Sequence, residues 1–191
     1  TTQLSNLTQE QVLGLSSAQL RAFTDDNLAV INDAAFTGLS TKTIAGLTAS
    51  KITALTSDQT AALDSDQILA LKSNQIQALE AEDLNAFEEG EINALTKKFI
   101  QALTSTQINN LSSEQLQLLS ADQIAYLTQD QVSNLSTDQL NLLTADQISA
   151  LTTKQVGWMS SNQLSKLATS LLVELGTNQI AKLTTAQLNN L

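Results

Sequence analysis

The sequence has no cysteine, histidine or proline, and only one tryptophan, one tyrosine and one methionine among its 191 residues. Without thiolate or imidazole groups, the chain lacks ligands for the usual zinc, iron–sulfur and haem-histidine sites. It equally lacks the residues of a Cys–His or Ser–His nucleophile. No disulfide can form. We therefore expect no cofactor, no resident metal and no enzymatic activity.

Basic residues are also scarce. The chain has 9 lysines and arginines against 19 acidic residues, which gives a net charge of −10. This charge disfavours nucleic acid and anionic membranes as partners. No apolar run approaches the ~18 residues of a membrane span, so we also expect no membrane insertion.

What the sequence contains is a period of eight residues. Every eighth residue from Leu7 to Leu191 is large and apolar, and so is every eighth residue from Leu4 to Leu188 except Thr60. These two columns hold 47 large apolar residues in 48 positions, without an insertion or deletion. The chain is therefore an internal repeat of 24 octads.

Each octad carries the signals of a helix start. The consensus is [ST]-x-D-Q-[ILV]-x-A-L, in which Ser or Thr can cap a helix and Gln three residues later can complete a capping box. Asp in the first turn faces the positive end of the helix dipole. We predict six helix N-caps in the most regular stretch: Ser112, Ser120, Thr128, Ser136, Thr144 and Thr152.

The period of eight excludes a single long helix, because eight residues overshoot two helical turns by about 80° and the apolar pair would spiral around the rod. Coiled coils need periods of 7 or 11, and strands need a period of two. Helices of about six residues are unstable alone and must stack. We expect the following residues in the stacked core: Leu116, Leu119, Ile124, Leu127, Val132, Leu135, Leu140, Leu143, Ile148 and Leu151.

A superperiod of 24 residues suggests how many octads form one turn. Gln117-Leu118-Leu119 recurs as Asn141-Leu142-Leu143, and Ala121–Ile124 recurs as Ala145–Ile148. Either a 24-residue unit was duplicated recently, or one solenoid turn contains three short helices. The second interpretation predicts an all-α solenoid over residues 1–191, with eight turns and a length of about 75 Å.

The three-helix turn would place Asp122 near Asp146. Such acidic columns could attract Ca²⁺ weakly, or each Asp could simply serve its own helix start. No EF-hand loop or glycine-rich calcium-binding nonapeptide is present.

Three stretches depart from the consensus. In residues 24–38, Asn32 is a substitute cap. In the acidic stretch 80–91, glutamates replace the hydroxyl caps, so we expect neighbouring helices to run together. Residues 168–176 lose the cap and the Gln, which predicts a longer helix ended by Gly176.

Candidate partner contacts are Tyr126, Trp158, Glu88 and Glu89. The two aromatic residues stand in a column rich in alanine, where they either bind a partner or fill a wider groove between turns. The acidic pair either attracts a cation or a basic partner or belongs to a solvated face.

Runs such as LSADQIAYLTQDQVSNLSTDQL resemble the LTxxQ[IV]xAL octapeptide repeats of very large bacterial secreted or surface proteins, which are described as adhesin-like or haemagglutinin-like. The resemblance covers essentially the whole chain. It implies an extracellular or cell-surface location and a structural or adhesive role, with no catalytic residues to carry over.

We therefore expect a structural protein that serves as a filament subunit or an adhesin stalk. Neither end of the chain carries a polar capping repeat, which favours head-to-tail stacking of copies or continuation into other domains of a longer chain. The alternative is a solenoid module that binds a protein or a glycan.

Overall fold

The computed structural model describes residues 3–191, which form 22 α-helices and two 3₁₀ helices and contain no strand. Each helix has three to six residues. None of the helices in this described part is long and apolar enough to cross a membrane. The structure confirms the predicted all-α solenoid of short helices.

The chain divides into two compact units, the first ending at Leu95 and the second comprising Thr96–Leu191. The first contains η1 (Leu4–Asn6), α1 (Gln9–Leu13), α2 (Ser17–Ala22), α3 (Asp25–Ala29), η2 (Asp33–Gly38), α4 (Thr41–Ala45), α5 (Ala49–Thr53), α6 (Ser57–Ala61), α7 (Ser65–Leu69), α8 (Ser73–Ile76), α9 (Ala81–Asn85) and α10 (Glu89–Ala94). The second contains α11 (Lys97–Ala102), α12 (Ser105–Asn109), α13 (Ser113–Leu118), α14 (Ala121–Ala125), α15 (Gln129–Ser133), α16 (Thr137–Leu142), α17 (Ala145–Ser149), α18 (Thr153–Trp158), α19 (Ser161–Lys166), α20 (Thr169–Leu172), α21 (Thr177–Ile180) and α22 (Thr185–Leu188).

The helices begin where the octads place their hydroxyl residues. All six predicted caps accept a hydrogen bond from the backbone N–H three residues later, at 3.1–3.3 Å between N and O. The same residues have extended backbones, with ψ between 155° and 168°. An extended residue cannot continue the preceding helix, so each cap also forces the chain to turn.

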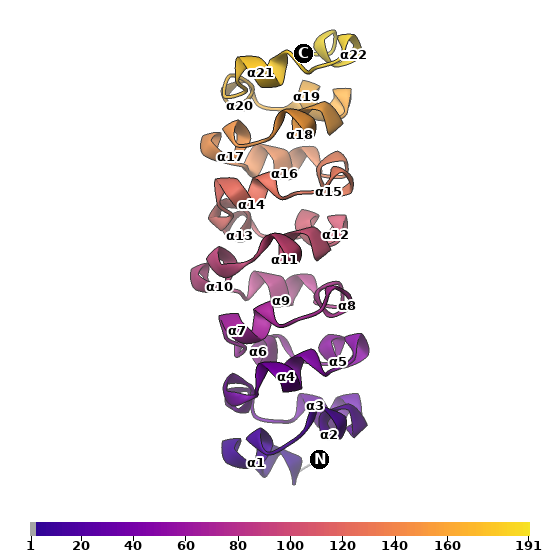
Figure 1. Cartoon of the computed structure of the whole chain (residues 1–191), viewed down its shortest axis with the longest axis vertical. Helices are drawn as coiled ribbons and strands as arrows, with labels where there is room; N and C mark the ends of the chain where they lie inside the picture. The colour runs from indigo at the N-terminus through magenta and orange to yellow at the C-terminus, as the bar shows by residue number, and fades with distance from the viewer. Residues whose placement is uncertain (1–2) are drawn as a thin grey trace. The chain divides into compact units, whose positions relative to one another are not determined.

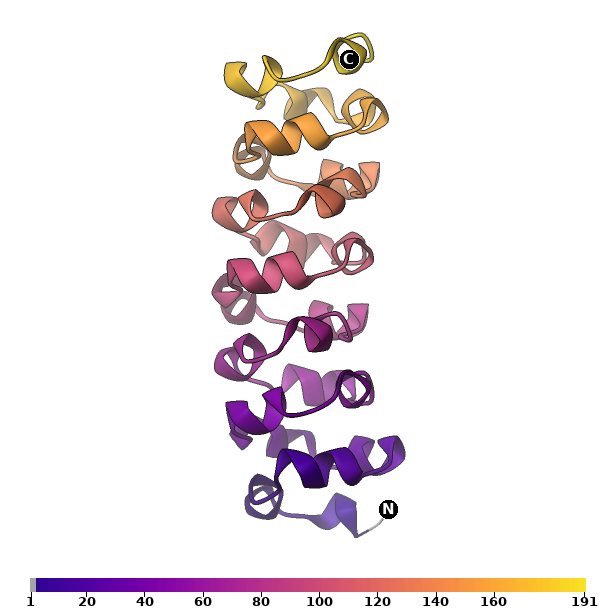
Figure 2. The same ribbon diagram turned by 45° about the vertical axis from the view of Figure 1, so that its right-hand side comes forward.

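Helices three apart in the chain pack against each other. In the second unit α13 contacts α16, α16 contacts α19, and α19 contacts α22, while α12, α15, α18 and α21 form a second column. In the first unit α4 contacts α7 and α7 contacts α10. Within each unit the columns can be followed in Figure 1 and, after rotation, in Figure 2. One turn of each solenoid therefore contains three helices, or 24 residues.

The apolar columns fill the space between the three helices of a turn. All ten core residues predicted above are buried, none more than 4% exposed. The residues of the first column lie inside the short helices, and those of the second column lie just after the helix ends, so both side chains of an octad face the interior. Neighbouring turns supply the burial that helices of this length need.

Two of the irregular stretches differ from the predictions made for them. The helices at 80–91 do not run together: Glu80 and Glu88 are the N-cap residues of separate helices. Their backbone N–H groups donate to the side chains of Asp83 and Glu91, at 2.8 and 3.0 Å. These bonds supply the other half of a capping box, so the helix boundary persists without a hydroxyl.

Residues 168–176 do not form one longer helix. Helix α20 has four residues, and Gly176 is the extended N-cap of α21 rather than the end of a helix. The Gly176 N–H donates to Oε1 of Gln179. The glutamine therefore marks this helix start even where the cap has no side chain. In residues 24–38, Asn32 caps η2 as predicted, accepting from the Ala34 N–H at 2.9 Å.

Candidate functional site

A recurring glutamine connects one turn to the previous one in many of the octads. In Gln147 the Oε1 accepts from the N-cap N–H of Thr144 at 2.9 Å. Gln139 is an exception: its Oε1 has no partner, and the Ser136 N–H donates to Oδ1 of Asn109 at 2.8 Å. The Nε2 of these glutamines donates to backbone carbonyls of the previous turn: Gln147 reaches Leu116 at 2.8 Å and Leu119 at 2.7 Å. At least ten glutamines make the bond to the carbonyl 28 residues earlier, from 59, 67, 75, 131, 139, 147, 155, 163, 179 and 187.

These glutamines are buried because their side chains lie between two turns, where they bind carbonyls of the previous turn. Gln147 is 2% exposed, whereas Gln11, which makes the same capping box with Thr8, is exposed. A buried carbonyl without a donor is costly. The glutamine bridge therefore satisfies the ends of the short helices and fixes the spacing between turns.

Lys51 shows that the donor is the essential part of the bridge. It occupies a glutamine position, and its Nζ donates to the Phe23 carbonyl, 28 residues earlier, at 2.6 Å. It also pairs with Asp25 at 2.6 Å. A lysine side chain cannot accept a bond from the cap N–H, so at this octad the bridge is kept and half of the capping box is lost.

Asp83 departs most from this pattern. It replaces glutamine, is only 3% exposed, and has no nitrogen to donate to a carbonyl. Burial raises the pKa of its carboxyl, opposed by its bond to Glu80 and by the nearby Thr60 hydroxyl. Thr60 is the one break in the apolar columns, and its buried hydroxyl has no hydrogen bond of ordinary geometry. The Thr60 hydroxyl, which interrupts an apolar column, thus lies beside the Asp83 carboxyl, which replaces a glutamine.

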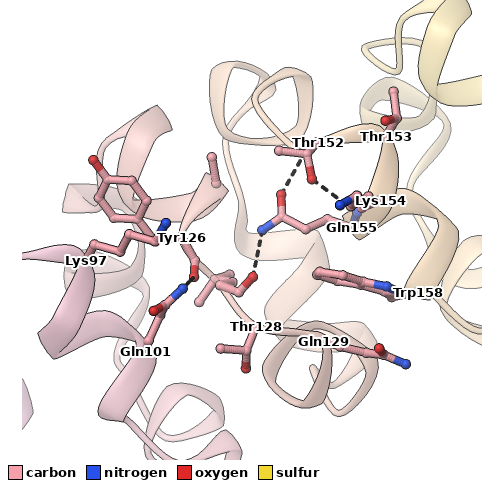
Figure 3. A pocket seen from close by; sticks show the side chains of 12 residues that line it. Lys97, Gln101, Tyr126, Thr128, Gln129, Thr152, Thr153, Lys154, Gln155 and Trp158 are labelled. Carbon is pink, nitrogen blue, oxygen red and sulfur yellow. Dashed lines mark hydrogen bonds between the residues drawn. The ribbon is translucent and has the colours of Figure 1, made fainter.

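A groove of about 580 Å³ opens on the surface of the second unit. Lys97 and Gln101 come from α11, Tyr126 ends α14, and Lys154 and Trp158 come from α18. Figure 3 shows Tyr126 and Lys97 together on one side, and Lys154 and Trp158 on the other. The groove thus brings together the two aromatic residues that the sequence suggested as partner contacts.

The groove is basic in an acidic chain. It is lined by two of the 9 basic residues and by no acidic residue. Lys97 Nζ lies 5.8 Å from the centroid of the Tyr126 ring, a cation–π contact that orients both side chains. Gln101 Nε2 donates to the Tyr126 carbonyl at 3.3 Å, which fixes the adjacent corner. Tyr126 and Trp158 are both half-buried.

The other suggested contacts lie elsewhere. Glu88 and Glu89 are exposed at the start of α10, in the first unit. Within residues 3–191, no three carboxylates come together in a way that could hold a metal ion. Glu114 serves its own helix start: bonds to its carboxylate from its own backbone and from Ser112 and Ser113 lower its pKa.

The fold and its corners define the chain as a repeat protein. A family model described as the ALTTAQ repeat matches residues 100–129. The six letters of that name correspond to the junction between two helices, and residues Ala150–Gln155 of this chain read ALTTKQ. Leu151 is the core residue that follows α17, Thr152 is the N-cap of α18, and Gln155 forms the bridge to the previous turn. No curated protein matches the chain.

Proposed function

We propose that the chain is a structural repeat array that acts as a spacer on the outside of a cell, without catalytic activity. The observation that carries this proposal is the glutamine bridge, which repeats the same joint between turns at ten or more positions. A joint of this kind adds turns without altering the earlier ones, which suits a part whose task is length. The resemblance to repeats of bacterial secreted and surface proteins supports the external location.

The distribution of polar groups also supports a structural role. An enzyme concentrates unlike groups in one pocket. In this chain the carboxylates recur at helix starts, as in Asp122, Asp130 and Asp146, all in the first turns of their helices. Each carboxylate interacts favourably with the dipole of its own helix.

A spacer must keep its length in solution. Small-angle X-ray scattering of the purified chain tests this property, and the proposal expects a maximum dimension of about 75 Å. A compact particle about half as long, or a flexible distribution of dimensions, would contradict the spacer role.

The same joint can act between copies. The last described turn exposes Leu188 and Leu191, at 45% and 51%, which are residues of the two core columns. A second copy stacked on this face would cover them with its own turn. Electron microscopy at micromolar concentration tests this: filaments with an axial repeat of one chain would support self-assembly, and single particles would contradict it.

A further inference from the structure

The groove of the second unit has a composition that the spacer role does not need. It gathers the only tryptophan and the only tyrosine of the chain. An exposed face selected only for solubility in this chain would carry the acidic residues that dominate elsewhere. This composition is a property of the groove alone and does not depend on whether the chain serves as a spacer.

We propose that the groove binds an acidic oligosaccharide whose sugar rings carry carboxylates. Tyr126 and Trp158 offer rigid, half-buried ring faces against which the apolar faces of sugar rings can stack. Lys97 and Lys154, one on each side, supply the cations for carboxylates. Gln129, Thr152 and Thr153 line the same space and can exchange hydrogen bonds with sugar hydroxyls.

Size and backbone structure favour a saccharide over a protein segment. About 580 Å³ lies within the range of ~300–1,000 Å³ of small-ligand sites and suits about two or three sugar rings. The described residues of this unit contain no strand, so the groove has no sheet edge on which an extended peptide could add its own hydrogen bonds.

The groove contains its own reporter. Trp158 is the only tryptophan, so intrinsic tryptophan emission comes from the proposed site alone. We would titrate the full chain with trigalacturonate and with 3′-sialyllactose while following this emission. The fully methyl-esterified trigalacturonate and lactose are the neutral counterparts. The proposal expects saturable changes with the acidic saccharides and at least tenfold weaker binding of the neutral ones.

Neighbouring lysines provide a matched pair of variants. Lys97 lines the groove and Lys98 does not, although both are exposed and adjacent in α11. Lys97→Gln and Lys154→Gln should each lower the affinity for acidic saccharides about fivefold. Lys98→Gln should leave this affinity unchanged. Trp158→Phe, followed by calorimetry, should keep most of the affinity because a ring face remains. Far-UV circular dichroism checks that each variant is folded.

Four results would overturn the proposal. The first is that neither acidic saccharide binds with a dissociation constant below roughly 10 mM. The second is that the methyl ester binds as tightly as the acid. The third is that Lys98→Gln weakens binding as much as Lys97→Gln. The fourth is that hexaglutamate binds as tightly as trigalacturonate, which would mean that the groove recognises negative charge on a peptide rather than sugar rings.

Discussion

Changing Gln147 to glutamate separates the two tasks of the bridging glutamine. The replacement has almost the same shape, and its carboxylate still accepts the Thr144 N–H, a bond of 2.9 Å in the native chain. It cannot donate to the carbonyls of Leu116 and Leu119, which lie 2.8 and 2.7 Å from Nε2. Gln147→Glu therefore removes the bridge and leaves the cap.

The cost follows from the contacts that are lost. Two hydrogen bonds are worth about 1 kcal/mol each, and the ionised carboxylate would be buried facing carbonyl oxygens. We expect Gln147→Glu to lower the free energy of unfolding by about 2–4 kcal/mol at pH 7. Part of this loss should be recovered as the pH falls, because the protonated carboxyl can donate one bond.

Urea unfolding followed by far-UV circular dichroism measures this loss. Gln11→Glu is the matched control, because Gln11 has the same capping box but is exposed. It should change stability by less than about 0.5 kcal/mol. Equal effects of the two substitutions would refute the reasoning, because they would show that the bond between turns contributes nothing.

Three further changes test other parts of the fold. Thr144→Ala should cost ~1 kcal/mol in urea unfolding through its lost cap, and no loss would mean that the hydroxyl is dispensable. Ile148→Asp places a carboxylate at a fully buried position and should abolish the thermal transition of the second unit; unchanged helicity and melting would contradict the core assignment. For Asp83, whose pKa is raised, the favourable contribution is full below the unfolded value of 3.8 and is lost as pH rises through the folded pKa. The free energy of unfolding of Asp83→Asn, relative to that of the native chain, should therefore increase from acidic to neutral pH. A difference between the two proteins that does not change with pH would contradict this.

The octad predicts most of this fold because its signals are local and agree with one another. Hydroxyl caps, first-turn acids and an apolar pair three apart specify each short helix without reference to distant residues. The number of helices per turn is a long-range property. It could be inferred only because the recurrence of Ala121–Ile124 at Ala145–Ile148 records which residues stack.

The bridge between turns was not predicted, although the sequence contained its signal. A capping box accepts glutamate as readily as glutamine, yet 16 of the 24 positions hold Gln, while Glu91 is the only glutamate. Only glutamine can accept and donate at once. The excess of glutamine over glutamate therefore indicates a second partner for Nε2, and only the structure shows where that partner lies.

The groove and the helix boundaries at irregular octads were beyond sequence reasoning for different reasons. Tyr126 and Trp158 are 32 positions apart, and only the stacking of α14 against the turn containing α18 brings them to one groove with Lys97. At Gly176 a side-chain cap is missing, and the bond from its N–H to Gln179 maintains the boundary. Cap propensity alone does not include that compensation.

The most direct test of the account is a measurement of which residues contact the bridging amides. In a nuclear Overhauser spectrum of the labelled chain, the side-chain amide protons of Gln155 should show contacts near Leu127 and Ile124, 28 and 31 residues earlier. The same offsets should recur for Gln147 and Gln163. Contacts one octad nearer or one octad farther along the chain would mean two or four helices per turn and would contradict the three-helix turn described above.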